Sequence, residues 1–279
     1  MQILTTLPDL QHWQTQNRAQ SIGFVPTMGA LHEGHLSLVE ASSAKDDATI
    51  VSIFVNPTQF NDKSDLEKYP RTLEADLAML DTKNVDAVFA PPEDVIYPSE
   101  GFKVPDFELT DLTNVLEGAY RPGHFDGVVQ VVYRLLDLVR PDRLYMGLKD
   151  YQQQAIIAAM LRQSDFAIQL IPVSIVREED GLAMSSRNRR LTPEQRLIAP
   201  TIYQTLQQAQ ADWIAQFLPT SIQAKAISTL EQAGFQVDYF EIVEATTLES
   251  VELFDESVDA IACVAAYIGD IRLIDNLQF

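Results

Sequence analysis

The sequence predicts an α/β protein in which a doubly wound parallel sheet is followed by a smaller α+β unit. Up to about residue 176, short β-rich runs alternate with segments of helical periodicity, which is typical of strand–helix–strand units. Beyond residue 191 the pattern changes to two helical segments followed by three strands. We place the boundary in the polar stretch 177–191 and expect domains at 1–180 and 181–279.

The first domain is expected to contain five strands. Their runs of Val, Ile, Leu and Phe lack polar alternation, which indicates burial on both faces of a parallel sheet. The strands are expected at residues 21–26, 49–55, 86–90, 142–146 and 167–176. Helices are expected between them, near residues 35–44, 71–81, 125–139 and 150–163. The run VVQVVYRLLDLV, residues 128–139, is interpreted as core.

The second domain is expected to be smaller and mixed. Residues 192–217 have helical periodicity, which Pro200 breaks or kinks because proline lacks a backbone donor. A further helix is expected at 220–233. Strands are expected at 237–243, 260–268 and 271–275.

Composition limits the possible classes of function. The chain has 279 residues, 46% of them apolar, and its 20 basic and 40 acidic residues give a net charge of −20. Such a charge repels nucleic acid and anionic membranes, so neither is an expected partner. No apolar run approaches the ~20 residues that span a bilayer, and the N-terminus lacks the features of a signal peptide. The single cysteine, Cys263, excludes an intramolecular disulfide, and we expect a cytoplasmic protein.

Every unusual polar cluster follows a predicted strand of the parallel sheet. In chain order the clusters are TMGALHEGH, NPTQF, PPEDVIYP, GLKDYQQ and GLAMSSRNRR. The carboxyl ends of parallel strands share one edge of a sheet, where ligands bind. The sequence therefore predicts one composite site.

The HEGH motif predicts an anion site. His35 is expected in the first turn of a helix, where free N–H groups and the helix dipole favour an anion, and Gly34 permits close approach. His32 and His35 could then donate hydrogen bonds to phosphate oxygens. The alternative is that both histidines only cap or pack the turn. A zinc site is disfavoured because the spacing is not HExxH and no third ligand is evident.

Other clusters offer groups suited to an anionic substrate. Lys149 and Arg187 are cations in a very acidic chain, and Gln59, Gln152 and Gln153 are neutral donors and acceptors. Arg121 lies in a Pro/Gly loop, where simple turn chemistry is an equal alternative. Asp76 or Glu74 could hold Mg²⁺, although most acids on such a helix are only solvated. Arg189 and Arg190 are interpreted as a surface turn paired with the acids of residues 177–180.

Several common motifs are missing from the sequence. It contains no GxGxxG, no GxxxxGK[ST] and no GxSxG. A nucleotide site in this chain would therefore be of another kind.

Six motifs occur together and in order: PTMGALHEGH, VSIFVNPTQF, YPRT, RPGHFDGV, GLKDYQQ and MSSRN. Together they resemble the pantoate–β-alanine ligases, which belong to the HxGH nucleotidyltransferases. The resemblance runs from about residue 20 to 191 and resumes weakly at VDYFEIV and IRLIDN. It implies a Rossmann-like first domain and a smaller second domain that closes over the nucleotide.

The resemblance also implies a reaction and its partners. Pantoate and ATP would give pantoyl adenylate and pyrophosphate, and the amine of β-alanine would then displace AMP to give pantothenate. Mg²⁺ would be required, and the protein would be a homodimer. A carboxylate that attacks an α-phosphate needs no nucleophile from the enzyme, only two anions held in line and the developing charge stabilised.

By position, the resemblance implies the site residues. The catalytic, phosphate-facing set is His32, His35, Lys149, Ser185, Ser186 and Arg187. The remaining ATP-binding residues are Met28, Gly147, Asp150, Val176 and Met184. The pantoate-binding residues are Met28, Gln59, Gln153 and Arg121, and the metal ligand is Asp76.

Two alternatives remain open. One is another HxGH enzyme, such as a nucleotidyltransferase that makes a dinucleotide, against which NPTQF and KDYQQ argue together. The other is a nucleotide-binding regulator without catalysis, against which the intact set of His32, His35, Lys149 and Arg187 argues. Formation of AMP from ATP, pantoate and β-alanine would separate them.

Overall fold

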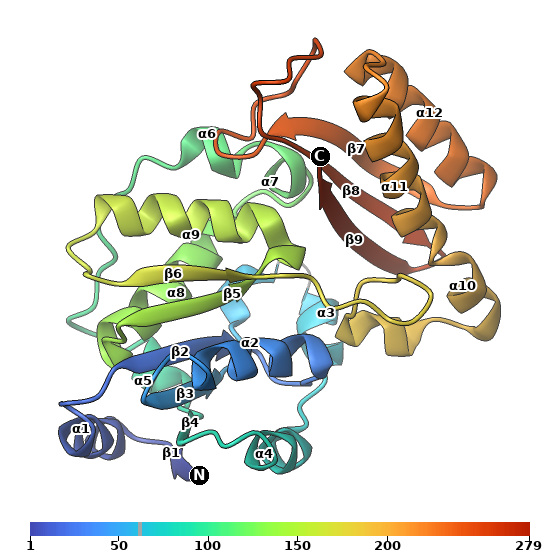
Figure 1. The fold of residues 1–279 in the computed structure, drawn as a ribbon. Helices are drawn as coiled ribbons and strands as arrows, with labels where there is room; N and C mark the ends of the chain where they lie inside the picture. The colour runs from blue at the N-terminus through green and yellow to red at the C-terminus, as the bar shows by residue number, and fades with distance from the viewer. Residues whose placement is uncertain (61–62) are drawn as a thin grey trace. The chain divides into compact units, whose positions relative to one another are not determined.

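The computed structural model describes residues 1–60 and 63–279 as two compact units (Figure 1). Unit 1 comprises Met1–Leu109, Arg121–Leu148 and Ile156–Ser174. Unit 2 comprises Thr110–Tyr120, Lys149–Ala155 and Ile175–Phe279. This division differs from the predicted one at residue 180, because two earlier segments, Thr110–Tyr120 and Lys149–Ala155, fold with the residues from Ile175 onward.

Unit 1 is built on a six-stranded parallel sheet in the order β1-β4-β3-β2-β5-β6. The strands are β1 (Gln2–Leu4), β2 (Ile22–Thr27), β3 (Ala48–Ile53), β4 (Ala87–Phe89), β5 (Arg143–Gly147) and β6 (Gln169–Val173). From the central strand β2 the chain first adds strands on one side and later adds β5 and β6 on the other. The strand order therefore reverses beside β2, where open sheets of this kind bind ligands.

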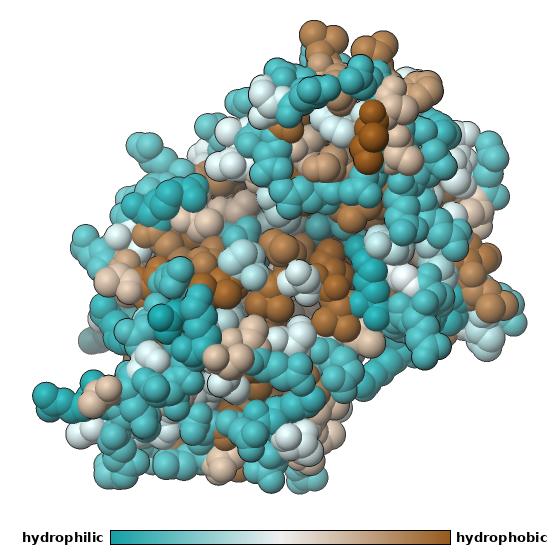
Figure 2. All heavy atoms as spheres, in the orientation of Figure 1, coloured by the Kyte–Doolittle hydropathy of each residue, from teal (hydrophilic) through white to brown (hydrophobic). Residues whose placement is uncertain are grey.

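The two ends of this sheet were the least predictable part. Strand β1 has only three residues, too few to show a periodic pattern. At the other end, β6 pairs only with β5, and its Leu170, Ile171 and Val173 stay partly exposed. Figure 2 shows apolar atoms gathered along this strand on a largely hydrophilic face. The prediction of burial on both faces is therefore wrong for β6.

Helices connect the strands of unit 1, and their apolar faces form its core. They are α1 (Leu7–Gln16), α2 (Glu33–Ser43), α3 (Lys63–Lys68), α4 (Leu73–Asp81), α5 (Glu93–Ile96), α8 (His124–Val139), most of α9 (Tyr151–Gln163) and the short turn η1 (Pro57–Gln59). Helix α8 buries ten residues, which confirms the core interpretation of 128–139.

Unit 2 contains a three-stranded antiparallel sheet in the order β7-β8-β9. Its elements are α6 (Thr110–Thr113), α7 (Leu116–Tyr120), η2 (Leu148–Asp150), η3 (Ser186–Arg190), α10 (Pro193–Ile198), α11 (Thr201–Ile214), α12 (Pro219–Gln232), β7 (Gln236–Glu244), β8 (Ala260–Ile268) and β9 (Ile271–Gln278). As predicted, the helical stretch 192–217 is interrupted at Pro200, which caps α11. The single Cys263 is buried in β8.

No helix in residues 1–60 and 63–279 combines the length and apolar character needed to cross a membrane.

Candidate functional site

The carboxyl ends of β2 and β3 bring the first two polar clusters to one edge of the unit 1 sheet. These strands pair in parallel from Ile22–Ala48 to Thr27–Ile53, so the segments that follow them leave the sheet at the same edge. His32 and His35 follow β2, and Gln59 follows β3. Lys149 and the residues after Ile175 follow β5 and β6 but belong to unit 2.

The two histidines cap helix α2 with their imidazole rings. His32 is the N-cap residue, and its Nδ1 accepts a hydrogen bond from the Gly34 backbone N–H at 3.2 Å. The Nδ1 of His35 accepts from the His32 backbone N–H at 3.3 Å. The ring centroids lie 4.1 Å apart. The two rings thus form a reciprocal capping box in which imidazoles replace the usual hydroxyl and carboxylate.

Capping determines which ring nitrogen carries the proton. A backbone N–H can only donate, so Nδ1 of both rings must be an unprotonated acceptor. In a neutral imidazole the proton then lies on Nε2. Both rings therefore cap the turn, and the same geometry gives each ring an Nε2–H donor. Capping and anion binding are compatible, because they use different nitrogens.

Asp76 holds the loop that leads to His32. Its side chain is buried, with 2% of the residue exposed, although it lies on α4. Oδ2 accepts from the Ala30 N–H at 3.0 Å and from the Thr72 hydroxyl at 3.1 Å. Oδ1 accepts from the Leu31 N–H at 2.8 Å. These contacts give the carboxylate a loop-holding role and lend no support to the predicted role as a metal ligand.

Gln59 and Met28, which are both predicted to bind pantoate, lie together in unit 1. The Gln59 Nε2 lies 3.0 Å from the Met28 Sδ. Its Oε1 accepts from Asn56 Nδ2 at 3.2 Å. Asn56, only 1% exposed, also donates to the Gly127 carbonyl oxygen and accepts from the Tyr97 hydroxyl. Asn56 therefore orients the Gln59 amide.

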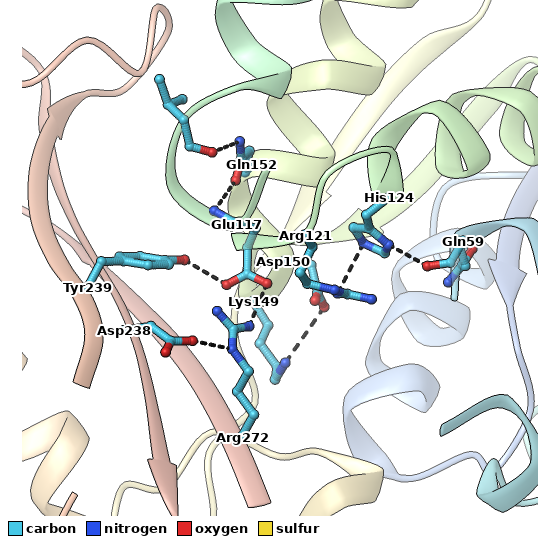
Figure 3. Close-up of polar contacts among 11 residues, drawn as sticks. Gln59, Glu117, Arg121, His124, Lys149, Asp150, Gln152, Asp238, Tyr239 and Arg272 are labelled. Atoms are coloured by element: carbon cyan, nitrogen blue, oxygen red, sulfur yellow. Dashed lines mark hydrogen bonds and ion pairs between the residues drawn. The ribbon is translucent and has the colours of Figure 1, made fainter. Parts of the chain in front are cut away.

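Arg121 is oriented by a histidine that sequence reasoning did not single out (Figure 3). The buried His124 contacts the Gln59 carbonyl oxygen through Nδ1 at 2.7 Å, and its Nε2 lies 3.2 Å from the Arg121 NH1. A carbonyl can only accept and a guanidinium can only donate, so this ring carries its proton on Nδ1. The position of His124 three residues after Arg121, at the start of a helix, was the available signal.

In unit 2, the η2 turn presents Lys149. Its backbone carbonyl accepts from Asn276 Nδ2 on β9 at 2.9 Å. Its Nζ lies 3.7 Å from the Asp150 Oδ2, and Asp150 is mostly exposed. Gly147 ends β5 in unit 1, where an added methyl group would make only an ordinary 3.9 Å contact with Leu38.

A short antiparallel turn presents the remaining phosphate-binding candidates. The Met184 N–H donates to the Val176 carbonyl at 3.0 Å, which brings two of the predicted ATP-binding residues together. Ser185 caps η3 by accepting from the Arg187 N–H at 3.2 Å. Ser185, Ser186 and Arg187 are all half-buried.

Ion pairs stabilise the turn between Val176 and Met184. The Arg177 guanidinium forms a two-pronged pair with the buried Asp275 of β9, at 2.6 and 3.0 Å. The acids Glu178 and Asp180 both pair with Arg196. Arg196 is thus a further partner of these acids, which the sequence analysis did not assign to them.

Glu117 anchors the early segment of unit 2 to the sheet (Figure 3). Its carboxylate accepts from the Tyr239 hydroxyl at 2.8 Å and pairs with Arg272 at 2.6 Å. Burial first, and the charge of Glu117 second, raise the pKa of Tyr239 well above its usual value, so the phenol stays a donor. Arg272 also pairs with Asp238 at 2.7 Å.

The two glutamines of GLKDYQQ have different environments. Gln152 is buried and bonds the Glu117 N–H and the carbonyls of Leu112 and Val115, so it supports the fold of this segment. Gln153 is half-buried. Of the two, Gln153 remains the candidate for substrate binding.

The part of the chain that the structure describes contains no group of three or more His, Cys, Asp or Glu side chains arranged to hold a metal ion. Residues 1–60 and 63–279 therefore do not by themselves supply three such ligands to one metal ion. Cys263 is also unsuited to nucleophilic catalysis, because burial strongly raises the pKa of its thiol.

Comparison with known proteins places this chain among a well-defined group. The family described as pantoate-beta-alanine ligase matches residues 2–278. Pantothenate synthetase of Bacteroides thetaiotaomicron is 46% identical over 100% of this chain and 99% of the relative. That of Porphyromonas gingivalis (strain ATCC 33277) is 43% identical over the same shares.

Solved structures of the same kind of protein are also similar to this chain. Pantothenate synthetase from Thermus thermophilus superposes with a TM-score of 0.91 at 41% identity, covering 100% of this chain and 99% of that one. Pantoate-beta-alanine ligase from Francisella tularensis, solved with beta-gamma ATP and beta-alanine, has a TM-score of 0.81 at 35% identity, covering 100% and 97%. Since sequence and fold match relatives of one kind along the whole chain, this protein belongs to the pantoate–β-alanine ligase family.

Proposed function

We propose that this protein uses ATP to condense pantoate with β-alanine through a pantoyl-adenylate intermediate, releasing pyrophosphate and AMP. One observation carries the proposal most directly: the capping geometry gives His32 and His35 Nε2–H donors at the amino end of α2. Neutral donors beside a helix amino terminus are suited to phosphate oxygens. Family membership and the ligands of the Francisella tularensis relative support the same assignment.

In the first half-reaction, a pantoate carboxylate oxygen attacks the α-phosphorus of ATP. The new P–O bond forms as the bond to the pyrophosphate oxygen breaks, so no group on the enzyme needs to be modified. Charge develops on the phosphate oxygens, and we assign its stabilisation to His32, His35, Lys149 and Arg187. The hydroxyls of Ser185 and Ser186 are assigned to the triphosphate, and Gly147, Asp150, Val176 and Met184 to the rest of the nucleotide.

Pantoate is an anionic hydroxy acid, and its proposed site uses neutral amides beside one cation. The Gln59 amide is held by Asn56, and Gln153 is assigned to the same substrate. Met28 supplies an apolar contact next to Gln59. Arg121, oriented by His124, is assigned to the carboxylate. Amides orient hydroxyl groups without the cost of a buried charge.

In the second half-reaction, the β-alanine amine attacks the acyl carbon of the adenylate. The C–N bond forms, the C–O bond to AMP breaks, and the amine releases a proton. Mg²⁺ is proposed to accompany ATP and to neutralise phosphate charge, because this ion is usually held by substrate phosphates and water. The described residues provide no ion cage, so no step is assigned to a protein-bound metal.

The test is product analysis. With ATP, pantoate and β-alanine, we expect AMP, pyrophosphate and pantothenate in equal amounts. Without β-alanine, we expect one equivalent of pantoyl adenylate per protein, with release of pyrophosphate. Formation of ADP, or a covalently labelled protein after denaturation, would contradict the mechanism. Lys149→Ala should slow adenylate formation by a factor of 10² or more, about 3 kcal/mol of transition-state stabilisation.

We also propose a cytoplasmic homodimer. Strand β6 supports the dimer, since it is an end strand with partly exposed apolar side chains. Ile171→Lys would place a charge on that strand. A dimer through β6 predicts that this variant sediments as a monomer while the parent sediments as a dimer.

A further inference from the structure

We propose that Asp76 is a positioning residue that fixes the two histidines through the loop before them. The proposal deepens the proposed function, since it concerns the same phosphate-facing groups. Asp76 and the loop are far apart in sequence: the Ala30 and Leu31 N–H groups that it binds lie 46 and 45 residues away. Helix α4, which lies between β3 and β4, therefore holds the loop between β2 and α2.

The loop needs such a restraint because its backbone is unfavourable. Ala30 has φ of +51° and Gly29 has φ of +80°. A left-handed conformation is unfavourable at a non-glycine residue such as Ala30 and persists only where the surroundings impose it. Two hydrogen bonds to one buried carboxylate provide that restraint at Ala30 and Leu31.

The restraint is transmitted directly to the rings. Leu31 is bonded to Asp76 and precedes His32, whose backbone N–H is the donor that fixes the His35 ring. His32 is itself the N-cap whose ring accepts from Gly34. A shift of the loop would therefore move the N-cap backbone and both Nε2 atoms.

The same contacts argue against a metal at Asp76. Three donors occupy its two oxygens, and only 2% of the residue is exposed. The Gly29 backbone also packs closely on this carboxylate, because a methyl group added at Gly29 would lie 3.0 Å from the Asp76 Oδ2. A ligand to Mg²⁺ would have to give up the loop contacts.

The most informative variant is Asp76→Asn. The amide has nearly the same shape but only one acceptor, so its NH₂ group must face a backbone N–H and one loop contact is lost. Asp76→Ala loses all three contacts. Thr72→Val removes only the third donor and leaves both loop contacts in place. Asp81→Asn is the matched control, because Asp81 is exposed on the same helix.

The first measurement needs no substrate. The chain has four histidines, His12, His32, His35 and His124, so imidazole ¹⁵N resonances can be followed individually. In metal-free protein, Asp76→Asn should shift the resonances of His32 and His35 and leave those of His12 and His124 in place. Asp81→Asn should shift none of them. Unchanged His32 and His35 resonances in Asp76→Asn would overturn the proposal, whether or not the parent makes pantothenate.

The second measurement separates positioning from metal binding. Loss of one contact to a charged acceptor should lower kcat/KM for ATP by roughly 10- to 100-fold, with KM for β-alanine and the Mg²⁺ requirement unchanged. A metal ligand at Asp76 predicts the reverse: a higher Mg²⁺ concentration for half-maximal rate, with activity restored by excess Mg²⁺. That result would also overturn the proposal. If the parent makes no adenylate, the proposed function fails, and the resonance experiment still decides the role of Asp76.

Discussion

Replacing His32 by asparagine separates the two roles that the structure gives this ring. Nδ1 caps α2 by accepting from the Gly34 N–H, and Nε2–H is the proposed phosphate donor. Asparagine is one of the best N-cap residues, because its side-chain oxygen accepts from the second or third helical N–H. It therefore keeps the cap but lacks the imidazole Nε2–H. Alanine at the same position loses both.

The expected magnitudes follow from these contacts. Loss of an N-cap costs about 1 kcal/mol, so His32→Ala should melt roughly 2–4 °C below the parent. His32→Asn should melt within about 1 °C of the parent, since the cap is retained. A hydrogen bond to a charged phosphate contributes about 1.5–3 kcal/mol, so both variants should form adenylate roughly 10- to 150-fold more slowly. The Asn variant should be the faster of the two, because its amide can still donate weakly.

The assay is single-turnover adenylate formation with excess protein, together with a melting curve of each unliganded variant. His12→Asn is the control, because His12 is an exposed histidine on α1 whose ring contacts Gln16. It should match the parent in rate and melting point. If His32→Asn keeps both the melting point and the rate of the parent, His32 is only a cap and the assignment to phosphate is wrong.

Three further predictions use similar measurements. Gly127→Ala should lower the melting point by several degrees and also slow the reaction, because a methyl group there would lie 2.5 Å from the Thr58 carbonyl oxygen and 2.8 Å from the Gln59 nitrogen; an unchanged melting curve would contradict this. The side chain of Asn276 donates to the Lys149 carbonyl oxygen, and neither Ala nor Asp at this position can do so. Asn276→Ala and Asn276→Asp should therefore both slow adenylate formation about tenfold, with KM for pantoate unchanged. A normal rate in the Asp variant would show that the contact is dispensable. Asp180→Asn should be less stable than the parent near neutral pH, because the hydrogen bond from Arg196 lowers the pKa of Asp180 below 3.8. The ionised carboxylate therefore stabilises the fold fully above that pH, and this contribution is lost as the pH falls through the lowered pKa. A stability difference between variant and parent that persists in strong acid would refute the prediction.

Local patterns were sufficient for most of the fold. The strands expected at 21–26, 49–55, 86–90 and 142–146 were found within a few residues of those positions, because each is a dense apolar run. The break at Pro200 followed from proline chemistry. The short strand β1 and the partly exposed β6 were missed or misjudged, because their environment depends on a place at the ends of the sheet.

The candidate site was predictable in residue type but not in partners. The position of His32 and His35 at a helix start was readable, whereas the tautomers depend on which backbone N–H each ring meets. The contacts of Asp76 with the Ala30 and Leu31 N–H groups could not be foreseen, because burial is not visible in the letters LEADLAML. One signal was present: Asp76 and the buried Leu80 are four residues apart and so share a helix face.

The contacts of Glu117 join parts of unit 2 that the ribosome synthesises at very different times. Its partners Tyr239 and Arg272 are 122 and 155 residues further along the chain. At about 5–20 residues per second, roughly 8–30 s of synthesis separate Glu117 from Arg272. For most of that interval the segment Thr110–Tyr120 has been made, whereas the β-strands that complete its unit have not. A nascent chain that is stopped near residue 174 would contain this segment and Lys149–Ala155 without the strands of their unit, and the segment Thr110–Tyr120, which is made first, would wait longest for its partners.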